Sequence, residues 1–194
     1  MEGTDPVNNK LAAALSGGAV LMLVLSGCAE GNQKVDEYAK RICDQLGPQL
    51  KKISQANQSI TSTAADGKPE DIKKADSAAF DKISKAYAAM SASVEKAGPP
   101  PVEGGAKTQQ EAVKELKGTS RAYSDLKKSV DRLDTMDQGK FAEGLSGIVE
   151  QLDEINRLGG KAIQKFQSGD LGAAMGQQAG CQRPGGELKP NGDK

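Results

Sequence analysis

Residues 69–97 read PEDIKKADSAAFDKISKAYAAMSASVEKA, and this stretch decides the fold of the 194-residue chain. Its apolar side chains recur every three or four positions, which is the spacing of one face of an α-helix. Pro69 suits the first position of a helix, and Glu70 and Asp71 favour its positive end. The stretch therefore predicts an amphipathic helix with one apolar face: Ile72, Ala75, Ala79, Phe80, Ile83, Tyr87, Met90 and Val94.

Three further stretches, 35–65, 107–136 and 140–167, repeat this spacing and predict three more amphipathic helices. Two of them contain weak points. Gly47-Pro48 predicts a kink or a brief break after Leu46, because proline removes a helical hydrogen bond. Gly159-Gly160 predicts a bend, since each glycine weakens a helix by about 1 kcal/mol relative to alanine.

The sequence GPPP at 98–101 ends the second helix and makes 98–106 a connector between two helical hairpins, 35–97 and 107–167. Each hairpin is too small to fold well alone. We therefore expect an all-α domain over 35–181, an antiparallel four-helix bundle with a short fifth helix at its C-terminal end.

The fifth helix is expected over 171–181, with Asp170 as its N-terminal cap. Gly172, Gly176 and Gly180 give it a bare face, which predicts a thin helix laid closely against the bundle. The polar residues 182–194 are interpreted as a disordered tail.

The N-terminal region carries an apolar stretch, Leu11–Leu25, directly before Ser26-Gly27-Cys28. The stretch is short for a membrane span, which needs about 20 apolar residues, and has the length of a signal-peptide core. Leu25-Ser26-Gly27-Cys28 resembles the lipobox of bacterial prolipoproteins, and the rest of the chain is similar to small secreted proteins of actinobacteria.

The lipobox resemblance implies that residues 1–27 are a signal peptide recognised through Leu25, Ser26 and Gly27. Cys28 would become the first residue of the mature chain, with a diacylglycerol on its thiol and often an acyl group such as palmitate on its amine. Residues 28–34 would be a tether that holds the bundle close to the extracytoplasmic face of the cell membrane.

The first ten residues depart from this pattern, because Glu2 and Asp5 accompany the single basic residue Lys10. A signal peptide normally begins with a positively charged segment. Our hypothesis is that translation starts at Val7 and that residues 1–6 belong to an over-extended gene model.

The chain has three cysteines. Once Cys28 is assigned to the lipid, Cys43 and Cys181 remain as one pair in an exported protein, and an oxidising compartment favours a disulfide between them. Such a bridge would staple the C-terminal segment to the first helix.

The chain contains no histidine, and its 26 basic residues balance its 26 acidic residues. Histidine is the usual general base and the commonest zinc ligand, so its absence argues against most hydrolytic and zinc chemistry. Two runs of carboxylates offer oxygen ligands for calcium, but the solvated face of a helix is the interpretation we adopt: Asp131, Asp134, Asp137 and Glu150, Asp153, Glu154. We expect no enzyme activity, no cofactor or metal, and no nucleic-acid partner.

The sequence thus favours a non-enzymatic envelope protein whose bundle contacts another protein or the cell wall. The alternative is a carrier that holds an apolar ligand between its helices. A large apolar pocket between the hairpins would favour the carrier, and a tightly filled core would argue against it.

Overall fold

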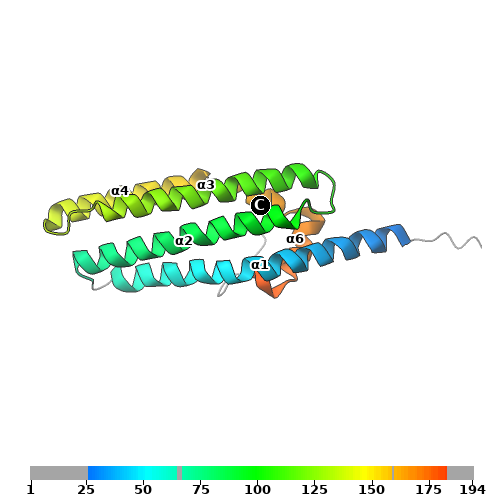
Figure 1. Cartoon of the computed structure of the whole chain (residues 1–194), viewed down its shortest axis with the longest axis horizontal. Helices are drawn as coiled ribbons and strands as arrows, with labels where there is room; N and C mark the ends of the chain where they lie inside the picture. The colour runs from blue at the N-terminus through cyan, green and yellow to red at the C-terminus, as the bar shows by residue number, and fades with distance from the viewer. Residues whose placement is uncertain (1–25, 65–66, 159, 183–194) are drawn as a thin grey trace, which may run out of the picture.

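The computed structural model describes residues 26–64, 67–158 and 160–182, with backbone alone for 26–31 and 158. The described residues form six α-helices and a short 3₁₀ helix (Figure 1), which are α1 (Ser26–Ala64), α2 (Pro69–Ala97), α3 (Gly105–Asp131), α4 (Gln138–Leu158), α5 (Lys161–Phe166), α6 (Gly169–Gly176) and η1 (Ala179–Cys181). The all-α prediction is confirmed. The expected start at Val7, most of the signal peptide and the tail from 183 onward lie outside the described residues.

Helix α1 is longer and more continuous than its sequence predicts. It spans 39 residues with Pro48 inside it, so of the kink or brief break expected after Leu46 the break is absent. Apolar residues on both sides of Pro48, among them Leu46 and Leu50, pack into the same core cluster, and this tertiary packing holds the helix together across the proline. Helix α1 is already helical at Ser26, the first described residue, so residues 28–34 are helical where we expected a tether.

Helices α2 and α3 form the central hairpin of the bundle (Figure 1). One pair of serines links the two helices through hydrogen bonds from side chain to backbone. Ser84 Oγ donates to the carbonyl oxygen of Ser120 at 2.8 Å, and Ser120 Oγ donates to the carbonyl oxygen of Ser84 at 2.9 Å. Tyr38 of α1 secures the connector, because its hydroxyl donates to the carbonyl oxygen of Gly98 at 2.9 Å. Burial raises the pKa of Tyr38 to about 12, so this donor stays protonated at physiological pH.

The expected fourth helix over 140–167 is divided into α4 and α5. Gly160 adopts a φ of 99°, in the left-handed region that favours glycine, and directly precedes α5, so a new helix starts where we predicted only a bend. Helix α3 is also shorter than predicted and ends at Asp131, with residues 132–137 forming the turn into α4.

The expected fifth helix over 171–181 consists of α6 and the separate turn η1. Ser168 occupies the N-terminal cap position of α6, and Asp170 lies inside its first turn, so the prediction that Asp170 caps this helix is wrong. Both elements pack on the N-terminal half of α1.

The core consists of two clusters that share Ile53 and Tyr87 at their border. The first joins α1, α2 and α3 to α5 and α6, and includes the fully buried Ile42 and Ala112. The second lies nearer the other end of α1 and joins α1, α2 and α3 to Ile148 of α4. The antiparallel hairpin arrangement is therefore present, with both hairpins sharing one continuous core.

Helix α4 packs along α3, and the described residues show no comparable packing between α4 and α1 (Figure 1). Helices α6 and η1 cover the N-terminal half of α1. One face of the C-terminal half of α1 is left partly open by this arrangement.

Candidate functional site

The lipobox residues lie at the edge of the described region. Leu25 falls outside it, while Ser26, Gly27 and Cys28 form the first turn of α1 as far as backbone is concerned. A chain cut before Cys28 would therefore run directly into a helix.

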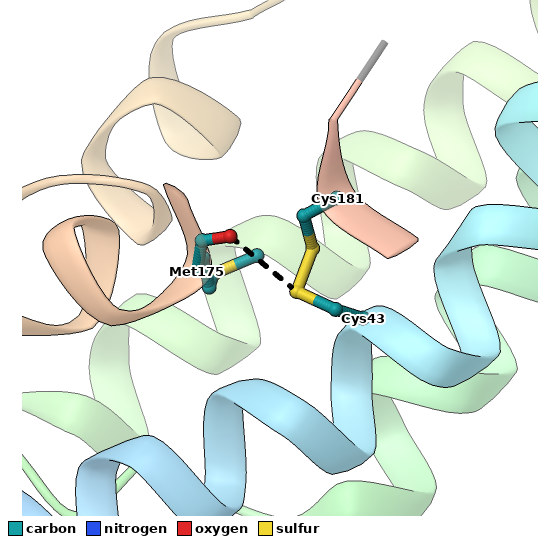
Figure 2. The surroundings of a disulfide bond; sticks show 3 residues. All are labelled: Cys43, Met175 and Cys181. Carbon is teal, nitrogen blue, oxygen red and sulfur yellow. Dashed lines mark hydrogen bonds between the residues drawn. A yellow bond between two sulfur atoms is a disulfide. The ribbon is translucent and has the colours of Figure 1, made fainter. Parts of the chain in front are cut away.

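The other two cysteines form the expected disulfide. Cys43 of α1 and Cys181 of η1 are bonded, with 4.9 Å between their Cα atoms and a sequence separation of 138 residues (Figure 2). The Cys43 sulfur also lies 3.9 Å from the carbonyl oxygen of Met175, a contact made by an oxidised sulfur that carries no proton. Cys43 is fully buried and Cys181 is half-buried against the first core cluster.

Glycine allows η1 to approach α1 closely enough for this bridge. A Cβ atom on Gly180 would lie 2.3 Å from the carbonyl oxygen of Cys43, and one on Gly47 would lie 2.8 Å from that of Gly180. A Cβ on Gly176 would meet nothing within 4 Å. The predicted bare glycine face thus makes its close contact with α1 at Gly180.

The first carboxylate run is used in local structure. Asp131 binds Ser77 Oγ at 2.5 Å and Lys127 Nζ at 2.6 Å, and the hydrogen bond from Lys127, followed by that from Ser77, lowers the pKa of Asp131. Asp134 accepts from the amide of Met136 at 2.9 Å. Asp137 Oδ1 accepts from the amides of Gly139 and Lys140 and so caps α4.

The second run is solvent-exposed on α4, where Glu154 pairs with Arg157. No group of three or more His, Cys, Asp or Glu residues suited to a metal ion is found in the described part of the chain. The solvated-face interpretation fits the second run, whereas Asp134 and Asp137 of the first run lie in the turn between α3 and α4.

A groove of about 640 Å³ runs along the open face of α1. It is lined by one uncharged stripe of α1 together with Tyr87 of α2: Leu50, Ile53, Ser54, Asn57, Gln58, Thr61 and Ser62. Tyr87 stacks on Tyr123 of α3, with ring centroids 5.7 Å apart and an interplanar angle of 14°. The aromatic side of the groove is therefore fixed by the central hairpin.

Asp76 is a carboxylate that the sequence reasoning passed over. It lies on α2 one turn before Phe80 and is only 7% exposed, with no hydrogen bond or ion pair to a described residue. Every fully buried side-chain oxygen or nitrogen in the described region has a partner, so the Asp76 oxygens still reach solvent. Burial raises the pKa of Asp76 to about 6.

The groove and Asp76 were detectable from the sequence only in part. Residues 53–64, ISQANQSITSTA, carry no charge in a chain that is 27% charged, and this contrast was the available signal. That this stripe lacks a covering helix depends on where α4 packs, which periodicity does not specify.

None of the helices in the described region combines the length and apolar character required to cross a bilayer. Comparison of the chain with protein-family models, with curated proteins and with solved structures gave no match. The functional argument therefore rests on the residues and contacts described above.

Proposed function

We propose that this chain is a lipid-anchored, non-enzymatic protein of the cell envelope, attached through Cys28 to the extracytoplasmic face of the membrane. The observation that carries the proposal is the disulfide between Cys43 and Cys181. Disulfides persist in oxidising compartments and are rare in the cytosol, so the bridge supports export. Cys28 is then left as the cysteine available to the lipid.

The described side chains support a binding role over a catalytic one. Among the described residues, Ser77 and Asp131 most resemble a catalytic pair of nucleophile and base, because the Ser77 hydroxyl donates to the Asp131 carboxylate. A base suited to neutral pH needs a pKa near 7, whereas the pKa of Asp131 is lowered by its hydrogen bonds to Lys127 and Ser77. Asp76 has a pKa of about 6, but it makes no hydrogen bond to a nucleophile among the described residues. In this role the bundle contacts another envelope protein or the cell wall.

The proposal is tested by cell fractionation of wild type and of Cys28→Ser, with Ser26→Ala as the matched control, because alanine keeps a small residue in the lipobox. We expect wild type and Ser26→Ala in the membrane fraction and Cys28→Ser lost from it or retained as uncleaved precursor. Radioactive palmitate should label the first two chains and leave Cys28→Ser unlabelled. Equal labelling of Cys28→Ser and wild type would overturn the anchor.

A second candidate function is a carrier for an apolar ligand, and the groove on α1 specifically favours it. Its volume of about 640 Å³ lies within the range of about 300–1,000 Å³ that small-molecule sites occupy. The filled core clusters argue against a ligand inside the bundle, so the carrier candidate depends on this surface groove.

A further inference from the structure

The groove continues a face of α1 that is covered elsewhere. On the N-terminal half of α1, α6 and η1 pack against the helix, and the bare Gly180 closes that contact. From Leu50 onward the described residues provide no such cover, and the groove opens. The lining positions on α1 recur at intervals of three and four over about 18 Å of helix, so they form one continuous surface.

The charge of the lining selects the class of ligand. Charged residues make up 27% of the chain, yet none of the described residues that line the groove is charged. A charged group placed on this surface would lose water without gaining a counter-ion, which is unfavourable. A neutral molecule has no such penalty.

The groove is apolar at one end and polar at the other. Leu50, Ile53 and Tyr87 pack together against the first core cluster and mark the apolar end. Asn57, Gln58, Thr61 and Ser62 follow along α1 and offer amide and hydroxyl groups. This gradient matches a molecule with a hydrocarbon chain at one end and hydroxyl groups at the other.

The size of the surface favours a small ligand over a protein. A standard protein interface uses about 20–30 residues on each side. The groove offers a single helical stripe and one tyrosine.

We propose that this groove binds one molecule of a neutral, single-chain amphiphile. The hydrocarbon chain lies on Leu50, Ile53 and Tyr87, and an uncharged, hydroxyl-bearing head contacts Asn57, Gln58 and Thr61. The inference rests on the carrier candidate and specifies its ligand; it does not depend on attachment through Cys28.

The test is photolabelling of the full chain in isolated membranes with a diazirine-bearing monopalmitoylglycerol. A diazirine-bearing palmitate serves as the anionic comparison, and mass spectrometry locates the adducts. In wild type we expect the glycerol ester to label the groove segment, residues 50–64 together with Tyr87, and excess unlabelled monopalmitoylglycerol to compete. Palmitate should label this segment about tenfold less, a ratio equivalent to 1.4 kcal/mol.

Two variants distinguish the groove from the rest of the helix. Ser54→Trp fills the groove, whereas Gln55→Trp introduces the same side chain at an exposed neighbouring position outside it. We expect Ser54→Trp to reduce labelling by about tenfold and Gln55→Trp to leave it unchanged. If Ser54→Trp fails to fold, as judged by circular dichroism, Asn57→Asp adds a charge with little change of shape and should lower labelling in the same direction.

Three results would overturn the inference: no labelling of residues 50–64 or of Tyr87 in wild type, equal labelling by palmitate, or undiminished labelling in folded groove variants. Membrane attachment is read separately from the fractionation of Cys28→Ser. A failure of the groove proposal is therefore distinguishable from a failure of the anchor.

Discussion

The carboxyl group of Asp76 lies on the apolar face of α2, where burial raises its pKa from 3.8 to about 6. A carboxyl with a higher pKa in the folded state holds its proton more tightly there than in the unfolded chain. The stabilising effect of that proton is fully present below about pH 4 and is lost as the pH rises through about 6. Asp76 therefore destabilises the fold at neutral pH.

We predict that Asp76→Asn raises the free energy of unfolding at pH 7 by about 2 kcal/mol and that the gain disappears below about pH 4. Urea denaturation across this pH range measures the effect. Asp153→Asn, at an exposed position on α4, is the control and should change stability little at any pH. A gain for Asp76→Asn that is independent of pH would contradict the burial argument.

At the scale of elements, Glu115 explains how a six-residue helix survives next to a double glycine. Its carboxylate oxygens on α3 accept from the amides of Gly160 at 2.7 Å and Ala162 at 2.9 Å, at the start of α5. A negative charge there also complements the positive end of the helix. Lys165 of α5 adds a salt bridge to Glu111 at 3.1 Å.

Glu115→Ala should fray α5 and destabilise it by about 1–2 kcal/mol, because two amides at its start lose their acceptor. Hydrogen exchange should then accelerate at Gly160 and Ala162 and remain unchanged in the α2–α3 hairpin. Glu143→Ala removes an exposed carboxylate of α4 that makes no hydrogen bond to a described residue. Exchange at Ala162 that is the same in both variants would show that Glu115 does not cap α5.

The helices themselves were predictable because their apolar periodicity is strong, and α2 matches its predicted range of 69–97. The effects of Pro48 and of the glycines near 160 on the helices were less predictable. Proline at 48 is tolerated because packing on both sides of it outweighs the lost hydrogen bond. At Gly160 the backbone takes a positive φ, and α4 and α5 are separate helices. Local propensity marked both positions as weak points of a helix. Tertiary packing kept the helix continuous at Pro48.

At the scale of the whole molecule, α1 joins the predicted anchor to the groove. Leu50 lies 22 positions after Cys28, which is about 33 Å along a continuous helix. The anchor at Cys28 is a prediction from a short local motif, and the disulfide followed from the number of cysteines. The groove also required the arrangement of α4 relative to α1, so the sequence revealed only its uncharged stretch, residues 53–64.

The central claim is that the mature protein is an exported bundle that begins at a lipidated Cys28 and is closed by the bridge between Cys43 and Cys181. The most direct test is the mass of the protein extracted from its own membranes in the presence of a thiol-alkylating reagent, followed by peptide mapping. The account predicts an N-terminal Cys28 that carries diacylglycerol and a linked pair of peptides containing Cys43 and Cys181. An unmodified Cys28 preceded by residues of the signal stretch, or alkylated Cys43 and Cys181, would contradict it.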